Sequence, residues 1–227
     1  MTAPTDPPAA TLRRGEVSAV AASRGLAPED LDVRLRADAS SRRVVLVLFA
    51  VAIGWLLVGS IFGDIASFKL HWLDLLVDSA WLTFGRVRTA HLHAVNYGWA
   101  TAALIGTSIW LLPRLVHAEL RGATTALVGA VLFTLGIAIG IVAVLAGYQN
   151  GGMEWLEAPG LLAGPFLVVG GGLVGLSLFR TVAARRAEHL YVSVWYILGA
   201  FVWFPMLYVT GKWPTWSGVE SAAVAQP

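Results

Sequence analysis

TALVGAVLFTLGIAIGIVAVLAG, residues 125–147 of the chain, contains no charged side chain. A helix of this length and composition crosses the roughly 30 Å hydrocarbon core of a bilayer. Four other runs are equally free of charge, and they cover residues 44–63, 90–112, 159–179 and 190–210. The sequence therefore predicts an all-α, polytopic membrane bundle of about five transmembrane helices.

The composition of the whole chain agrees with this prediction. Of its 227 residues, 57% are hydrophobic and only 13% are charged, whereas a soluble domain carries about 25% charged residues. An ordinary soluble globular protein is therefore excluded. The chain contains no cysteine, which excludes disulfides and thiolate-bound metals, and its net charge of +2 is too small to indicate a nucleic-acid partner.

Lysine and arginine are unevenly distributed between the two sets of connecting segments. All but four of the sixteen lie before the first span, between the second and third spans, or between the fourth and fifth. The four on the other side are Lys69, Arg86, Arg88 and Lys212. Because cytoplasmic segments of membrane proteins carry the excess of positive charge, we expect the N-terminus inside and the C-terminus outside.

The segments outside the spans have distinct compositions. Residues 1–41 are polar and rich in arginine, which is not typical of a cleaved signal peptide. They are predicted to form a disordered cytoplasmic tail in front of a membrane domain of residues 42–227, although Pro28-Glu29-Asp30 suits the first turn of a helix. Residues 64–85 mix tryptophan with charged side chains, which is typical of a segment at the membrane surface.

Histidine is the residue to consider for chemistry inside the membrane, because the predicted spans contain no charged side chain. Of the five histidines, only His91 and His93 lie in a span. Two positions along an α-helix correspond to a rotation of about 200°, so the two imidazoles face nearly opposite sides. They are therefore not expected to bind one metal ion together.

His91 is followed, at steps of three and four residues, by Ala94, Gly98, Ala102 and Gly106. This stripe of small side chains leaves room either for a flat cofactor or for a closely packed helix. We therefore interpret His91 as a candidate axial ligand of a haem iron, through its neutral imidazole. The alternative is a histidine that only forms hydrogen bonds near the membrane surface.

Charged residues on the same predicted side as His91 complete the candidate site. Arg86 and Arg88 precede it, and guanidinium groups pair well with carboxylates such as haem propionates; their alternative role is to flank the span. Glu154 and Glu157 lie in the next loop on that side, where carboxylates can bind a hard cation such as calcium. Two carboxylates alone are too few for a complete calcium site, and the alternative is that both are solvated acids of the loop.

Residues 84–91, FGRVRTAH, resemble the start of the second helix in the catalytic subunit of cbb3-type cytochrome c oxidases. These enzymes form a branch of the haem-copper oxidases related to nitric oxide reductase. The family pattern is close to FGRLRPLHTN, and its histidine binds the low-spin haem b. The resemblance implies this role for His91, whereas Thr89 replaces the usual proline and His93 gains no role.

Two further stretches extend the resemblance. Residues 152–157, GMEWLE, are similar to the family's GKEYAE, whose first glutamate is associated with a calcium ion between haem propionates. This similarity implies that Glu154 is the better calcium candidate. Residues 185–196, RRAEHLYVSVWY, are similar to RREPHIYVANWFY at the start of the fifth helix. The resemblance covers about residues 44–226.

The resemblance implies a component of a terminal oxidase that transfers electrons from cytochrome c to oxygen in a bacterial inner membrane. The copper ligands, the high-spin haem and the second ligand of the low-spin haem are expected on another chain that carries the rest of the catalytic subunit. Subunits with c-type cytochromes are expected as further partners. The alternatives are a non-catalytic membrane module that binds haem or a partner, a scaffold without a cofactor, and a truncated fragment without activity of its own.

Overall fold

A computed structural model of the chain describes residues 14–23, 25, 27–148 and 160–216. These residues form helices and turns without a strand, so the predicted all-α fold is confirmed. The helices are α1 (Arg14–Ser23), α2 (Pro28–His71), η2 (Ala80–Leu82), α3 (Phe84–His93), η3 (Ala94–Ala100), α4 (Thr101–Leu115), α5 (Ala123–Ala146), α6 (Gly160–Ala183) and α7 (Val192–Trp216).

Four of these helices, α2, α5, α6 and α7, are long and apolar enough to cross a membrane, which confirms the predicted membrane helical bundle. The remaining predicted span, residues 90–112, lies in a continuous helical segment made of α3, η3 and α4. Here η3 is a π-helix of seven residues. Because this π-helix separates α3 from α4, neither α-helix alone reaches the length of a span.

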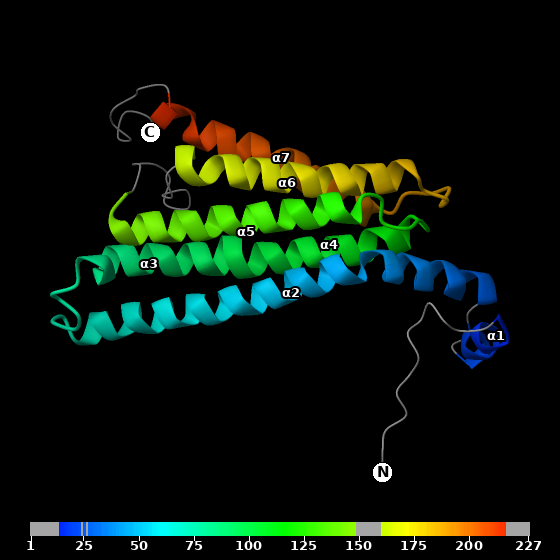
Figure 1. Cartoon of the computed structure of the whole chain (residues 1–227), viewed down its shortest axis with the longest axis horizontal. Helices are drawn as coiled ribbons and strands as arrows, with labels where there is room; N and C mark the ends of the chain where they lie inside the picture. Colours follow the sequence, from blue (N-terminus) through cyan, green and yellow to red (C-terminus); the bar gives the residue numbers. More distant parts are fainter. Residues whose placement is uncertain (1–13, 24, 26, 149–159, 217–227) are drawn as a thin grey trace, which may run out of the picture.

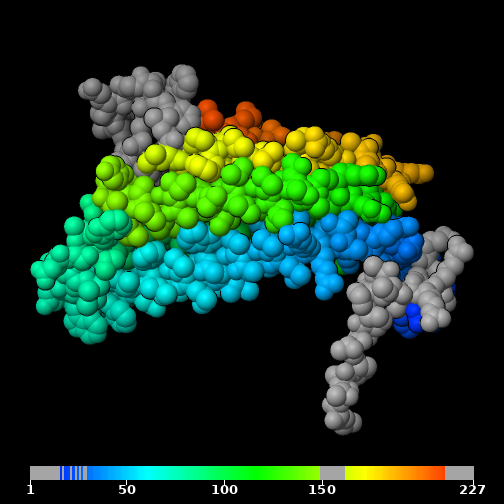
Figure 2. All heavy atoms as spheres, in the orientation of Figure 1, coloured from blue at the N-terminus to red at the C-terminus, as the bar shows by residue number. Residues whose placement is uncertain are grey.

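The helices lie side by side in chain order, from α2 through α3 and α4 to α5, α6 and α7 (Figure 1). Figure 2 shows the side chains of neighbouring helices in contact along the bundle. The start of α2, the α4–α5 turn and the α6–α7 turn lie at one end, which we call the Arg121 end. The α2–α3 connection and the C-terminus of α5 lie at the other, which we call the His91 end.

Helix α2 is longer than the sequence predicted. Its 44 residues correspond to about 66 Å, roughly twice the thickness of the hydrocarbon core. Residues 28–41, for which a disordered tail was predicted, are helical. Pro28 suits the first turn, and the polar part of the helix is stabilised by an ion pair of 2.8 Å between Asp32 and Arg36. Hydropathy identifies only the apolar part of such a helix.

Helices α5 and α6 approach each other closely at two glycines. A Cβ on Gly129 would lie 2.6 Å from the carbonyl oxygen of Gly170, and a Cβ on Gly170 would lie 2.6 Å from the backbone nitrogen of Phe133. Only glycine allows this separation, which is typical of small residues between membrane helices. The contact fixes the position of α5 and hence of its C-terminus at the His91 end.

Candidate functional site

His91 lies on α3, and its side chain contacts α2. The Nδ1 atom of His91 lies 2.8 Å from the carbonyl oxygen of Gly59. Because a carbonyl only accepts hydrogen bonds, this contact requires the proton on Nδ1. The imidazole is half-buried, and in its neutral form this tautomer leaves the lone pair of Nε2 for another group.

Gly63, one turn after Gly59 on α2, provides the space for this imidazole. A Cβ on Gly63 would lie 2.9 Å from both Cε1 and Nδ1 of His91. Real Cβ atoms do not approach ring atoms so closely, so an alanine at this position requires the ring to move. Gly59 and Gly63 together therefore determine where His91 lies.

The stripe of small residues that follows His91 packs against α2. A Cβ on Gly98 would lie 2.6 Å from the Trp55 ring, and one on Gly106 would lie 3.3 Å from Leu48. Ala94 is fully buried. The sequence left two roles open for this stripe, room for a flat cofactor or close packing of a helix. The structure shows the close packing of a helix.

A π-helix lies directly after the two histidines. At the end of η3, the hydroxyl of Thr101, the first residue of α4, donates a hydrogen bond of 2.8 Å to the carbonyl oxygen of Asn96, five residues earlier. This bond supports the wider turn, and π-helical segments of this kind are frequent at functional sites. The π-helix shifts the register of α4 relative to His91.

His93 has different surroundings from His91. It is 5% exposed, its Nδ1 donates a hydrogen bond of 2.9 Å to the carbonyl oxygen of Thr89, and its ring centroid lies 5.5 Å from that of Tyr97. The hydrogen bond of His93 to Thr89 and its ring contact with Tyr97 thus lie within its own helical segment, whereas His91 contacts α2.

Arg86 belongs to the first turn of α3, and its side chain reaches the C-terminal turn of α5. Its Nη1 donates hydrogen bonds to the carbonyl oxygens of Ala80, at 2.5 Å, and Leu145, at 3.2 Å. A Cβ on Gly147 would overlap the guanidinium. Arg86 thus satisfies a carbonyl in the last turn of α5, where a positive charge is also favourable for the helix dipole. Arg88 is exposed at the same end.

The remaining candidate ligand, Glu154, lies outside the described residues. In the part of the chain that the structure describes, no three His, Cys, Asp or Glu side chains come together in a way that could hold a metal ion.

Two residues of this site, Gly59 and Gly63, were missed in the sequence. The signal for them was present, because GSIFG at residues 59–63 places two glycines four residues apart, a spacing typical of closely packed membrane helices. What the sequence does not show is that the group packed there is the imidazole of His91.

Comparison with known proteins gives consistent similarities. Residues 43–223 match the family described as Cytochrome C and Quinol oxidase polypeptide I. The chain is 27% identical over 214 residues to a Cytochrome c oxidase subunit 1 homolog of Azorhizobium caulinodans, which covers 88% of this chain and 37% of that protein. It is 28% identical over 166 residues to the Cbb3-type cytochrome c oxidase subunit CcoN1 of Stutzerimonas stutzeri, with 72% and 34% covered. The chain thus spans about a third of the length of these curated relatives.

Proposed function

Because this chain belongs to the Cytochrome C and Quinol oxidase polypeptide I family, we propose that it is a component of a cbb3-like terminal oxidase that transfers electrons from cytochrome c to oxygen. It is a haem-copper oxidase-like subunit that crosses the bacterial inner membrane several times. The excess of arginine at the Arg121 end supports a cytoplasmic location for that end and a periplasmic location for His91.

The hydrogen bond between His91 and Gly59 carries the proposal. Metal-binding histidines commonly donate the proton of one ring nitrogen to a carbonyl or carboxylate, which orients the ring and leaves the other nitrogen for the metal. His91 has this arrangement, with Nδ1 held at 2.8 Å from the Gly59 oxygen. We therefore assign His91 as an axial ligand of a low-spin haem b through Nε2. The haem, when bound, accepts and releases one electron at a time.

The surroundings of His91 limit where such a haem is held. The interface that follows His91 along η3 and α4 is filled by α2, so the small-residue stripe does not contribute to the haem site. Within the described residues, both hydrogen bonds of Arg86 to backbone carbonyls come from Nη1, and its donors Nε and Nη2 form none there. These donors and the exposed Arg88 are proposed to hold the propionates.

A calcium ion near the propionates is proposed from the sequence alone, with Glu154 as its ligand. The carboxylate is of the type that calcium prefers. Further oxygen ligands are required for a complete calcium site, and they would come from the haem or from other segments.

This chain is proposed to work together with the regions of the catalytic subunit that lie outside the matched part. The curated relatives are about three times as long as the part of them that this chain matches. We expect the remaining part of the catalytic subunit to supply the copper, the high-spin haem and the second ligand of the low-spin haem. A c-type cytochrome subunit is expected to deliver the electrons.

The test is the haem content of the complex purified from membranes with its partners. His91→Ala is expected to remove the low-spin part of the reduced b-type absorbance, because the iron loses its axial nitrogen. His93→Ala is the matched control, since His93 lies two residues away and its Nδ1 is bonded to Thr89. Equal loss in both variants, or full absorbance in His91→Ala, contradicts the assignment.

A further inference from the structure

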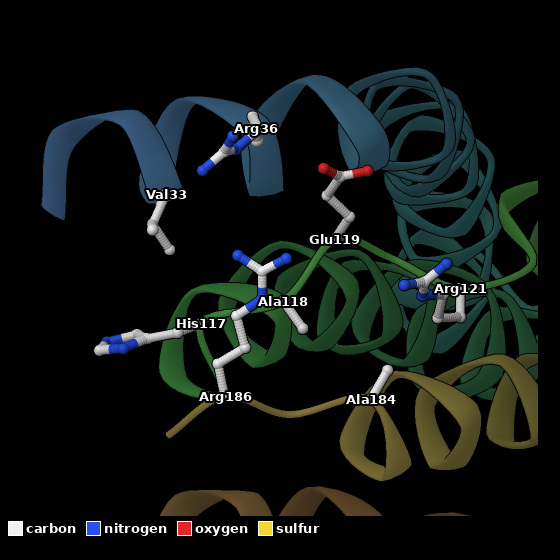
Figure 3. A pocket seen from close by; sticks show the side chains of 8 residues that line it. All are labelled: Val33, Arg36, His117, Ala118, Glu119, Arg121, Ala184 and Arg186. Atoms are coloured by element: carbon white, nitrogen blue, oxygen red, sulfur yellow. The ribbon is translucent and has the colours of Figure 1, made fainter. Parts of the chain in front are cut away.

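The Arg121 end of the bundle contains a polar pocket of about 60 Å³. It lies between the first turns of α2, the α4–α5 turn and the segment after α6 (Figure 3). Its lining residues are Val33, Arg36, His117, Ala118, Glu119, Arg121, Ala184 and Arg186. This pocket is at the opposite end of the bundle from His91 and takes no part in the proposed haem site.

Three arginines from three separate segments line this pocket. Arg36 comes from α2, Arg121 from the α4–α5 turn and Arg186 from the α6–α7 turn, and the Arg186 guanidinium is directed toward α2 (Figure 3). The only acid in the lining is Glu119, while Arg36 is also paired with Asp32 at 2.8 Å. Positive charges that line one pocket repel one another, and an anion bound in the pocket offsets this repulsion.

The α4–α5 turn is held in place on the α2 side by a bidentate ion pair. The guanidinium of Arg114 binds both carboxylate oxygens of Asp38, at 2.6 and 2.5 Å, and lies 4.3 Å from the centroid of the Trp110 ring. The backbone nitrogen of Leu120 donates a hydrogen bond of 2.8 Å to the hydroxyl of Ser40. The turn is therefore fixed relative to the helix that carries Arg36.

The same turn is also held on the α6 side. The backbone nitrogen of Arg121 donates to the hydroxyl of Thr181 at 2.9 Å, and the hydroxyl of Ser177 donates to the carbonyl oxygen of Arg121 at 2.5 Å. The backbone nitrogen of Arg186 donates to the carbonyl oxygen of Val116 at 3.0 Å. The backbone positions of Arg121 and Arg186 are thus set without any contribution from their guanidinium groups.

The turn also contains a strained residue. His117 has φ of 51°, in the left-handed region that residues with a side chain rarely adopt. Such a conformation persists only where the surrounding structure enforces it, and it occurs frequently at binding sites. The hydrogen bonds of the flanking residues provide this constraint.

We propose that this pocket binds the phosphate of an anionic phospholipid headgroup. Arg121 lies two residues before the apolar helix α5, and Arg186 lies three residues after α6, so both side chains lie where the headgroups of the bilayer are. Guanidinium groups donate paired hydrogen bonds to phosphate oxygens, and basic pockets between membrane helices bind anionic lipids. The proposal is independent of the oxidase function, because it uses neither His91 nor the haem.

The experiment measures lipid retention by native mass spectrometry of the full chain, with phosphatidylglycerol or phosphatidylcholine added in detergent. Phosphatidylglycerol is expected to be retained preferentially. Arg186→Gln and Arg121→Gln are each expected to reduce this preference about five-fold, because each removes one positive charge that attracts the anionic lipid at the membrane surface. Arg185→Gln is the matched control, because Arg185 is adjacent and exposed but does not line the pocket. Equal reduction in Arg185→Gln would show a diffuse charge effect and would overturn the proposal.

Two further arms complete the test. Glu119→Gln removes the only acid of the lining and is expected to increase phosphatidylglycerol retention, so a decrease contradicts the proposal. Inorganic phosphate is added at increasing concentration as the competing source of the same group. Displacement of the lipid by millimolar phosphate would identify a site for soluble phosphate and would overturn the assignment to a lipid.

Discussion

Arg86 of α3 donates a hydrogen bond of 3.2 Å to the carbonyl oxygen of Leu145 in the last turn of α5. The same side-chain nitrogen donates to Ala80, which lies before α3. One guanidinium therefore joins the second and third membrane segments at the end of the bundle that holds His91.

Arg86→Gln is expected to lower the free energy of unfolding by about 1 to 3 kcal/mol, because the Leu145 carbonyl loses its donor. Gly147→Ala is expected to have a similar effect, since its Cβ would overlap the guanidinium and Gly147 has φ of 93°. Thermal unfolding of the haem-free chain in detergent measures both. The double variant should lose less than the sum of the single losses, and strictly additive losses would show that the two residues do not act together.

Gly63→Ala is expected to reduce the low-spin haem content of the purified complex, because the new Cβ would displace the imidazole of His91. Gly54→Ala in the same helix is the control, since a Cβ there has no atom within 4 Å. Reduced b-type absorbance per complex is the measurement. Normal haem content in Gly63→Ala would mean that the position of His91 in this structure is not the one that binds iron.

Gly129→Ala is expected to destabilise the bundle by about 1 to 3 kcal/mol, because its Cβ would meet the Gly170 carbonyl, a backbone atom that cannot rotate away. Gly172→Ala in α6 has open space around it and is expected to be neutral or stabilising by roughly 0.5 to 1 kcal/mol. The melting temperature of Gly129→Ala should therefore fall, whereas that of Gly172→Ala should stay the same or rise. Equal shifts would disprove the close contact of α5 and α6.

Glu154→Gln is expected to abolish calcium binding to the purified complex, whereas Glu157→Gln should retain it. The prediction comes from the sequence similarity of residues 152–157, and the measurement is metal content by mass spectrometry after dialysis. A chelator should remove the ion and leave the low-spin haem in place, because His91 binds iron independently of calcium. If the Glu154→Gln variant retains calcium, Glu154 is not a calcium ligand.

The membrane segments could be predicted from sequence because each one is an uninterrupted run without charge. The ends of the helices could not be predicted in this way, as α2 shows. Residues 28–41 contain two arginines and four acids, so hydropathy is low there, yet the pairs Asp32–Arg36 and Asp38–Arg114 allow the helix to continue. The Asp32–Arg36 pair is local to the helix, but the Asp38–Arg114 pair joins segments far apart in the sequence and depends on tertiary structure, which a hydropathy window does not contain.

The candidate site was predicted in part, for a related reason. His91 could be named as a candidate because histidine is rare in membrane segments, and its sequence pattern is specific. The partner of its Nδ1 is a backbone carbonyl of α2, however, and a carbonyl group is common to every residue. The π-helix after His93 could not be predicted from the sequence pattern either, because its wider turn depends on the Thr101 hydroxyl and on packing against α2.

The order of the helices in Figure 1 has a consequence for biosynthesis. Among the segments that precede it, each later membrane segment packs mainly on the one directly before it, so a segment leaving the ribosome finds a partner already in the bilayer. Loops close over short sequence distances, which favours fast assembly. Among the four helices long and apolar enough to span the membrane in the described residues, α7 has the smallest buried share. It is therefore the segment whose retention in the bilayer depends least on the earlier helices and most on its own hydrophobicity.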